Sequence, residues 1–223
     1  MFLLIDKPKG ITSHDVIDSI RKITGERKVG HAGTLDPNAT GLLIVGVGRE
    51  STKRLGGLTN KTIKEYLAQV VLGEERDTED MEGITITKYE GVKPTEKEVK
   101  KTLLSFVGEY DQIPPLHSAI KIKGKKAYQL ARKGEEPNLK SRRVEIVKIE
   151  YVDYKYPLLE FTCLVSSGTY IRSLARDVGK KLSTGAYLGN LRRTKVGKYS
   201  VDDAIPLLDL TKSNWKEEAI TLK

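Results

Sequence analysis

The segment from Gly30 to Gly41 (GHAGTLDPNATG) is a predicted loop that brings three glycines, one histidine and one aspartate together. Loops held by a rigid scaffold commonly carry catalytic groups. Pro37 restricts Asp36 to an extended backbone, which would fix the direction of its carboxylate. Asp-Pro sequences are also common in turns, where the aspartate bonds its own backbone. Spacing alone leaves both interpretations open.

Other familiar chemistries lack their sequence patterns. The histidines stand at 14, 31 and 117, and no GxSxG motif of a hydrolase accompanies them. The acidic stretch 77–82 lacks the spacing of a calcium loop. Cys163 is the single cysteine, which excludes an internal disulfide and a cysteine-based zinc site. We therefore expect no metal and no disulfide.

Positive charge is concentrated in two stretches of the 223-residue chain. The net charge is +9, from 39 basic and 30 acidic residues. Residues 112–148 hold ten Lys/Arg against three Glu, and residues 170–200 hold eight against one Asp, so each contributes +7 and the rest −5. Clustered cations indicate a polyanionic partner. A merely solvated basic face is the alternative.

The elements that must position these residues can be read from hydrophobic periodicity. Phe2–Ile5 and Leu42–Val47 are predicted strands, and Ser13 is predicted to cap a helix that ends before Gly25. In a strand over 66–72, Tyr66 shares an apolar face with Ala68, Val70 and Leu72.

The second half of the chain is expected to contain further helices and strands. Thr95–Glu98 forms a capping box for a helix that ends before Gly108. Residues 112–140 are expected to form an exposed, mobile insertion with a short helix. Residues 143–156 and 158–166 are predicted to pair as antiparallel strands, and residues 170–182 form an amphipathic helix.

Together these patterns predict one compact α+β domain, with a mixed, largely antiparallel sheet and helices packed on it. The longest apolar run, Gly41 to Gly48, is far shorter than a membrane span, and no export signal is visible. We therefore expect a cytoplasmic protein without a membrane partner.

Five ordered segments resemble the TruB family of tRNA pseudouridine synthases, which make pseudouridine 55 in the T arm. The match spans about residues 2 to 208 and favours a catalytic role for Asp36 over a turn. The segments are DKPKGITS from Asp6, HAGTLDPNATGLLIVGVGRESTKRL from His31, KEY from Lys64 with DTED to Gly83, PPLHSA from Pro114, and GTYIR from Gly168 with Leu191-Arg192-Arg193.

The resemblance implies three catalytic residues. Asp36 is the family aspartate. Three actions stay open for it: attack on the sugar, removal of a sugar proton, or addition to the uracil base. Arg172 is expected beside it, because an ionised carboxylate in a closed pocket needs a partner. Tyr66 is expected to stack on the target uracil and to remove its C5 proton; the alternative is a core tyrosine.

The resemblance also implies a set of RNA-contacting residues. His31 is expected to pack against the extruded base, Leu191 to close the pocket and Lys7 to shape its wall. The alternatives are a locally bonded loop histidine at position 31 and a core leucine at position 191. The expected phosphate contacts are Lys53, Arg192, Arg193 and the insertion lysines Lys121, Lys123, Lys125 and Lys126. For Lys53 a merely solvated side chain is equally compatible with the sequence.

The implied activity retains every atom of the substrate, so we expect no cofactor. The expected partner is the T stem-loop of tRNA, with a monomeric enzyme that needs no protein partner. The expected organisation is a catalytic domain over 1–210, with the insertion at 112–140. Residues 211–223 would be a tail, without the usual C-terminal RNA-binding domain. The alternatives are a guide-dependent or ribosomal-RNA synthase and a non-catalytic tRNA-binding or folding module.

Overall fold

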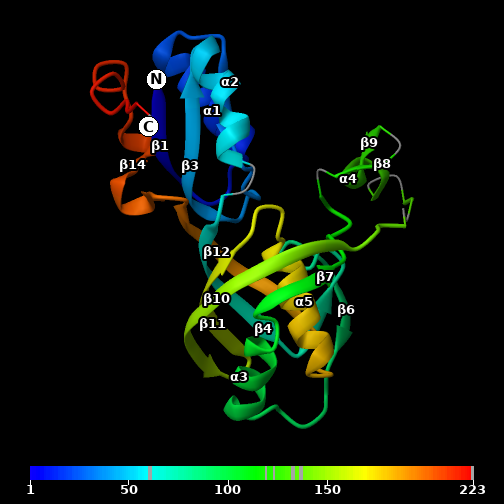
Figure 1. Cartoon of the computed structure of the whole chain (residues 1–223). Coiled ribbons are helices and arrows are strands. Elements are labelled where there is room, and N and C mark those ends of the chain that lie inside the picture. The colour runs from blue at the N-terminus through cyan, green and yellow to red at the C-terminus, as the bar shows by residue number, and fades with distance from the viewer. Residues whose placement is uncertain (60–61, 119, 123, 132–133, 136–137, 222–223) are drawn as a thin grey trace. The chain divides into compact units, whose positions relative to one another are not determined.

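The computed structural model describes residues 1–59, 62–118, 120–122, 124–131, 134–135 and 138–221 (Figure 1). The chain divides into two compact units. Unit 1 comprises Met1–Leu67 with Leu191–Lys223, and unit 2 comprises Ala68–Asn190. Strands β4 (Lys64–Leu72) and β12 (Ala186–Val196) each contain the residues at which the chain passes between units.

In unit 1, β1 (Phe2–Lys7) pairs antiparallel with β3 (Thr40–Val47), as the apolar runs predict. The strand order is β14-β1-β3-β12, and β3 and β12 are parallel with Gly41 opposite Arg193. The remaining strands are β2 (Val29–Ala32) on β3, β13 (Tyr199–Ser200) on β12, and β14 (Ile205–Pro206) on β1.

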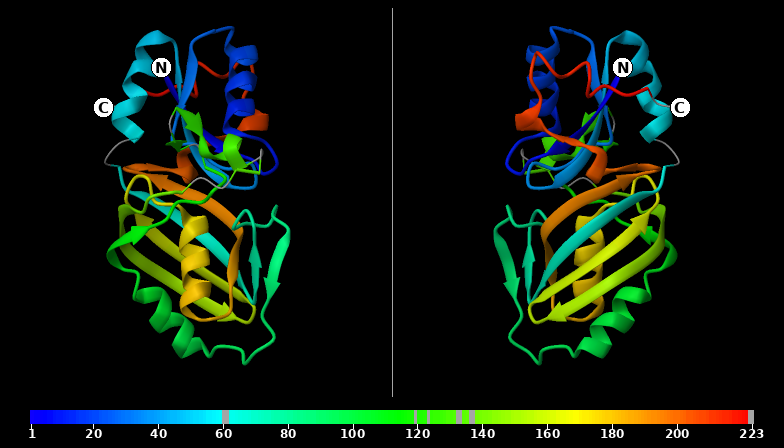
Figure 2. Two further views of the ribbon diagram at one scale, coloured as in Figure 1. Left: turned by 90° about the vertical axis from the view of Figure 1, so that its right-hand side faces the viewer. Right: turned by 90° about the vertical axis from the view of Figure 1, so that its left-hand side faces the viewer.

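Both faces of the β1–β3 pair are covered, which explains why these strands are apolar at successive positions rather than at alternate ones. Leu3 and Ile5 join a cluster that includes residues of α1 (Ser13–Thr24), whereas Phe2 and Leu4 join one that includes Leu55 of α2 (Arg49–Thr59). Figure 2 shows α1 and α2 on opposite sides of these strands.

The C-terminal segment packs on unit 1. Short 3₁₀ helices follow β13 and β14, at Val201–Asp203 and Leu207–Asp209. Trp215 is buried in the α1 cluster, and the backbone of Ile220 exchanges hydrogen bonds of 3.0 and 2.8 Å with Phe2. The described part of the expected tail, residues 211–221, thus contributes to the core of unit 1.

Two expectations for the start of the chain need correction. Thr12, not Ser13, caps α1, because the Thr12 side chain accepts from the Asp15 backbone. Ser13 is buried and its hydroxyl bonds the loop after β2 instead. Of the predicted loop 30–41, residues 30–32 instead end β2 and residues 40–41 begin β3, since strand pairing satisfies their backbone groups.

Unit 2 contains a largely antiparallel sheet in the order β12-β4-β11-β10-β7. β10 (Arg142–Lys155) and β11 (Leu158–Val165) form the predicted antiparallel pair, and β7 (Gly108–Gln112) pairs with β10. β5 (Glu74–Arg76) and β6 (Thr85–Lys88) form a separate hairpin. Residues along β4 alternate between buried and partly exposed, with Tyr66 on the buried face as predicted.

Helix α5 (Ile171–Lys181) lies on one face of this sheet (Figure 2). Ile171, Leu174, Ala175 and Val178 are buried, as the amphipathic pattern predicts. Helix α3 (Glu96–Leu104) has the predicted capping box at Thr95. It ends at Leu104 rather than just before Gly108, because the chain turns and Gly108 begins β7.

The basic insertion is not uniformly exposed. Gln112, Pro114, Pro115 and Ser118 are buried, so residues 112–118 are anchored in unit 2. Gln112 explains this in part: its side chain donates to the carbonyl of Tyr170 (3.0 Å) and accepts from the Tyr170 backbone (2.8 Å). Beyond it lie β8 (Lys121–Ile122), β9 (Lys125–Lys126) and the short helix α4 (Ala127–Ala131).

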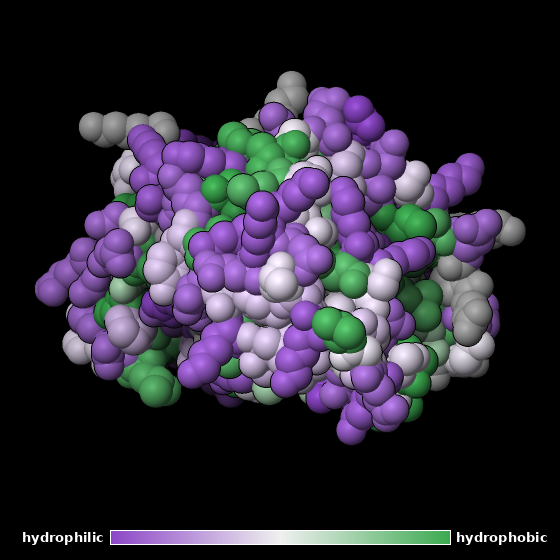
Figure 3. Space-filling model, turned by 90° about the horizontal axis from the view of Figure 1, so that it is seen from below, coloured by the Kyte–Doolittle hydropathy of each residue, from purple (hydrophilic) through white to green (hydrophobic). Residues whose placement is uncertain are grey.

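The predicted α+β class with a largely antiparallel sheet is confirmed. Among the described residues, no helix has the length and apolar character that crossing a membrane requires. The face in Figure 3 is mostly hydrophilic, with apolar side chains in separate groups. Exposed apolar residues of unit 2 include Ile84, Ile86 and Val92.

Candidate functional site

In unit 1, Lys7 holds the loop that carries Asp36 between β2 and β3. Its ammonium group donates to the carbonyl oxygens of Pro8 (2.9 Å), Ile11 (2.7 Å) and Pro37 (3.1 Å). The residue is fully buried. All three ammonium protons are therefore used, and this lysine fixes backbone rather than meeting substrate. The predicted role of Lys7 in shaping the pocket wall stays a prediction.

Ser13 and Arg193 hold the same loop at two further points. The Ser13 hydroxyl both donates to and accepts from the backbone of Leu35, each at 2.9 Å. Arg193, which is 1% exposed, donates to the carbonyls of Gly33 (2.9 Å) and Leu42 (2.8 Å). This burial argues against the phosphate contact predicted for Arg193, because a phosphate cannot reach a side chain enclosed by protein.

Gly41 is required by the close approach of β12. Its φ is +100°, and a Cβ atom there would lie 2.3 Å from the carbonyl oxygen of Arg193. Any larger residue would separate β3 from β12 and move Arg193 away from the loop. Gly41 therefore supports the loop indirectly, because it lets β12 and its Arg193 lie close to β3.

Asp36 itself is half-buried and lies between Leu35 and Pro37, whose backbones are held by Ser13 and Lys7. Burial lowers the pKa of Lys7 to about 8. The charges of Asp36 and Asp15 oppose this shift, and the charge of Arg193 adds to it. The carboxylate of Asp36 therefore lies close enough to the Lys7 ammonium group for their charges to interact.

Tyr66 and Lys64 lie on the buried face of β4, and both are 7% exposed. Burial and the nearby charge of Arg193 lower the pKa of Lys64 to about 8. The same two causes, with a smaller contribution from His14, lower the pKa of His31. His31 is therefore neutral at pH 7, which suits packing against a base better than carrying charge.

Arg172 lies in unit 2, at the start of α5, and is 5% exposed. It donates to the carbonyls of Thr78 (3.1 Å) and His117 (2.9 Å), and its guanidinium lies 3.5 Å from the Asp80 carboxylate. This arginine ties α5 to the 77–83 loop and to the start of the insertion. The predicted pairing of Arg172 with Asp36 joins residues of different units and stays a prediction.

An acidic cluster surrounds the next turn of α5. Arg176 contacts Glu79 at 2.5 Å and Asp177 at 2.8 Å, and Ser173 donates to Glu79 at 3.1 Å. Burial raises the pKa of both Glu79 and Asp177, although the charge of Arg176 opposes this. Sequence patterns do not reveal this cluster, since residues 77–82 show only an acidic stretch and Arg176 is far away in the chain.

The other predicted RNA contacts have varied surroundings. Arg192 forms two hydrogen bonds with Asp6, of 3.0 and 2.7 Å, and is partly exposed. Lys53 is exposed and pairs with Glu50 at 3.0 Å. Leu191 is partly buried, and its carbonyl accepts from Thr40 at 3.5 Å. Lys121, Lys125 and Lys126 lie in β8 and β9, with Lys125 exposed, whereas Lys123 lies outside the described residues.

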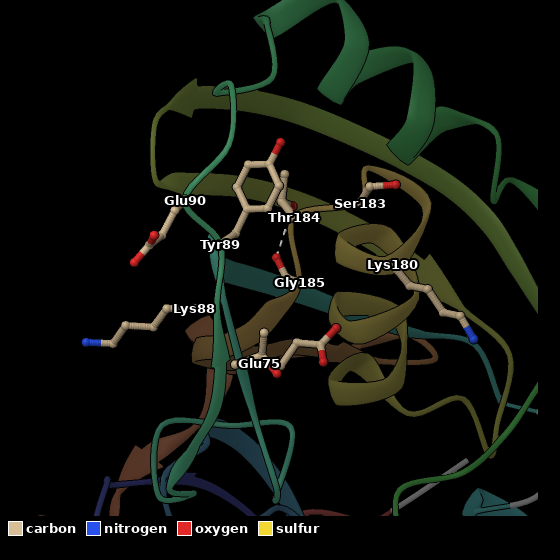
Figure 4. Close-up of a pocket in the computed structure, with 9 residues that line it drawn as sticks. Glu75, Lys88, Tyr89, Glu90, Lys180, Ser183, Thr184 and Gly185 are labelled. Atoms are coloured by element: carbon tan, nitrogen blue, oxygen red, sulfur yellow. Dashed lines mark hydrogen bonds between the residues drawn. The ribbon is translucent and has the colours of Figure 1, made fainter.

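A cavity of about 310 Å³ in unit 2 contains none of the predicted residues (Figure 4). It lies between the β5–β6 hairpin and the end of α5, where Thr184 donates to the carbonyl of Gly185 at 3.0 Å. Charges of both signs line it, from Glu75, Lys88, Glu90 and Lys180. Within the described residues, no group of three His, Cys, Asp or Glu side chains is placed to hold a metal ion.

Comparison with known proteins decides the family. The family model described as TruB family pseudouridylate synthase (N terminal domain) matches residues 21–171. The chain belongs to the TruB family. A second family model, tRNA pseudouridylate synthase B C-terminal domain, matches residues 172–222 of this TruB protein.

Relatives and a solved structure agree with the TruB assignment. The tRNA pseudouridine synthase B of Mycobacterium sp. (strain KMS) is 46% identical over 92% of the chain and 70% of the relative. That of Clostridium tetani is 46% identical over 95% and 72%. A crystal structure of a Cbf5-Nop10-Gar1 complex matches with a TM-score of 0.73 and 31% identity, over 99% of this chain but only 56% of that one.

Proposed function

We propose that this TruB protein converts uridine to pseudouridine in the T loop of tRNA, at position 55. Relatives named tRNA pseudouridine synthase B, 46% identical over most of the chain, support tRNA as the substrate. The observation that carries the proposal is the loop of Asp36, which Lys7, Ser13 and Arg193 hold at three separate points. A loop so constrained can present one carboxylate in a fixed direction.

The reaction detaches uracil from C1′ of the ribose, turns the base and rejoins it through C5. The base must first leave the stacked loop, which costs a few kcal/mol. His31, neutral and largely buried, supplies a surface against which the extruded base can pack. The product has the atoms of the substrate, so the proposed reaction calls for no redox partner and no cofactor.

Asp36 is proposed to act at the sugar or the base of the extruded nucleotide. An ionised carboxylate can serve there as nucleophile or base. Arg172 is proposed to balance the charge of Asp36 when RNA is bound, with its own position maintained by Thr78 and His117. Tyr66, on the buried face of β4, is proposed to stack on the uracil and to remove the C5 proton, and Leu191 to close the pocket.

Lysine and arginine side chains are proposed to hold the phosphates of the stem-loop. The proposed groups are Lys53, Arg192 and the lysines of residues 121–126. If five or six phosphates are neutralised, the logarithm of the affinity should fall with the logarithm of salt with a slope of about −4 to −6. Filter binding of unmodified tRNA between 50 and 300 mM salt measures this slope. A flat response would exclude a mainly electrostatic grip.

An Asp36→Asn variant tests the enzymatic proposal. With tRNA carrying C5-tritiated uridine, the wild-type protein should release tritium, and Asp36→Asn should lose at least about 1000-fold in rate while still binding tRNA. Asp18→Asn is the matched control, because Asp18 is exposed on α1 and pairs with Arg21. Wild-type protein that binds tRNA without releasing tritium would indicate a binding module instead.

The substrate position and the need for partners are tested in the same assay. The solved relative was crystallised in a complex with Nop10 and Gar1, which motivates the partner-dependent alternative. Wild-type protein alone, without guide RNA or a second protein, should modify tRNA but not a tRNA whose uridine 55 is replaced by cytidine. Activity only after addition of a guide RNA would contradict the proposal. Sedimentation of the active protein during tRNA modification tests the proposal that the enzyme works as a monomer.

A further inference from the structure

Lys64 is a buried cation that the proposed mechanism does not use. It is the first residue of β4 and shares the buried face of that strand with Tyr66. Placing an ammonium group in such surroundings costs free energy, whereas an apolar side chain would fill the space without that cost. Its charge must therefore serve an interaction, and the neighbours of Lys64 indicate which one.

Lys64 and Arg193 lie together beside Gly33, the first residue after β2. A Cβ atom at Gly33 would lie 3.3 Å from Nη1 of Arg193 and 3.6 Å from Cε of Lys64. Gly33 has a φ of +75°, so its backbone turns at this contact. Arg193 also donates to the Gly33 carbonyl. Two cations from two strands, β4 and β12, thus enclose the point where the loop begins.

We propose that Lys64 is a positioning residue, which together with Arg193 holds the Gly33 end of the loop so that Asp36 meets its substrate. The inference rests on the proposed function. Lys7 and Ser13 hold the other part of the loop, at Pro37 and Leu35. Without Lys64, Arg193 alone would define where the loop leaves β2.

The charge of Lys64 has a second effect on the loop. Asp36 is the one acidic residue between Gly30 and Gly41. Arg193 faces Lys64 from β12, and Lys7 and His31 experience the charge of Arg193 from β1 and β2. Opposite charges attract strongly where water is excluded. Of these cations, Lys7 interacts with the charge of the Asp36 carboxylate. Lys64 acts on the loop indirectly, through Arg193 and the Gly33 carbonyl that Arg193 holds.

A Lys64→Met variant removes the ammonium group and keeps an unbranched side chain that reaches as far as the lysine Cε. We expect kcat for tritium release to fall about 10- to 100-fold, because small misplacements of a reacting group have effects of this size. KM and tRNA affinity should stay within about 3-fold. Lys195→Met is the matched control, because Lys195 is exposed and contacts Glu65, which neighbours Lys64 in β4. Its kcat should equal that of the wild type.

A Lys64→Arg variant tests the role of charge even if Lys64→Met does not fold. The wild-type lysine loses its proton above about pH 8, whereas arginine stays charged. The ratio of kcat for Lys64→Arg to that of the wild type should therefore rise about 10-fold between pH 7 and pH 9. Other titrations, including that of Lys7, are common to both proteins and cancel in the ratio.

The outcomes separate this inference from the proposed function. Wild-type tritium release supports the function whatever the variants do. A Lys64→Met protein with wild-type kcat, or a loss confined to KM, would overturn the positioning role. A ratio for Lys64→Arg that is constant with pH would do the same if the pH dependence of stability shows that Lys64 loses its proton in that interval. Absence of tritium release from the wild type would instead overturn the proposed function, on which this inference depends.

Discussion

The two units hold their candidate catalytic residues with opposite electrostatics. In unit 1, the buried cations Lys7, Lys64 and Arg193 surround the loop of Asp36. In unit 2, the acidic side chains Glu79, Asp80 and Asp177 surround the arginines of α5. Unit 1 thus positions a carboxylate among cations, and unit 2 positions a guanidinium among acids.

The difference lies in what the buried charges bind. Lys7 and Arg193 donate to backbone carbonyls, so they determine the path of the chain. Arg176 binds two carboxylates as well as a carbonyl. The strength of these contacts therefore depends on whether the carboxyl groups are ionised. The cation-rich site should therefore respond to alkaline pH and the acid-rich site to acidic pH.

Arg176→Met should have the largest effect, because it leaves the partly buried carboxylates of Glu79 and Asp177 without their cation. We expect unfolding in urea to become easier by about 3–5 kcal/mol at pH 7. The loss should shrink at pH 5, where the raised pKa of each carboxyl group allows it to become neutral. Arg143→Met is the control, since Arg143 pairs with Glu109 and Asp111 at the surface and should cost less than about 1 kcal/mol. An equal loss of unfolding free energy in both variants would show that the Arg176 cluster is no more sensitive than a surface ion pair.

Lys7→Met should be the most damaging of the single changes in the cation-rich site. It leaves the carbonyls of Pro8, Ile11 and Pro37 with one donor fewer, which we expect to cost about 2–3 kcal/mol. Lys22→Met, at an exposed position of α1, is the control and should be neutral within about 0.5 kcal/mol. Urea unfolding measures both. A Lys7→Met protein as stable as the control would show that water replaces the ammonium group.

The pH dependence of stability should reveal the buried lysines. Burial lowers the pKa of Lys7 and of Lys64 in the folded protein from the ordinary 10.5 to about 8, so the unfolded chain binds more protons between these values. Stability should therefore rise with pH, by about 1–2 kcal/mol per lysine from pH 8 to 9.5. In Lys64→Met the rise should be roughly halved. A wild-type curve that is flat over this interval would contradict the burial of both ammonium groups.

Lys53→Ala should have the smallest effect on stability, because the Lys53–Glu50 pair is exposed. We expect a change below about 0.5 kcal/mol. If Lys53 meets a phosphate, however, the salt slope of tRNA binding should become shallower by about 1. Filter binding measures the slope and urea unfolding measures the stability. An unchanged slope would remove Lys53 from the proposed interface.

Much of the local structure was predictable because its causes are local. The capping box at Thr95 depends on a side chain three residues away, and alternation along β4 follows from strand geometry. The end of α3 was not predictable in the same way, because Gly108 was needed to begin β7 rather than to end the helix.

The candidate site was predictable only in its outline. The motif around Asp36 was visible, as was the resemblance that gave it a role. Lys64 was overlooked, although its spacing of two residues from Tyr66 on an apolar strand face was a readable signal. The cluster of Arg176 with Glu79 could not be found by spacing, because the two residues are 97 positions apart.

The sequence by itself determined the fold class, the order of most elements and the family, because periodicity, caps and motifs are written in neighbouring residues. The tertiary structure decided which cations stay at the surface and which become buried supports. Arg192 and Arg193 are adjacent in the chain, yet the first is partly exposed beside Asp6 and the second is enclosed beneath the loop of Asp36. Successive residues of a strand point to opposite faces, and only the packing of β12 against β3 determines what each face meets.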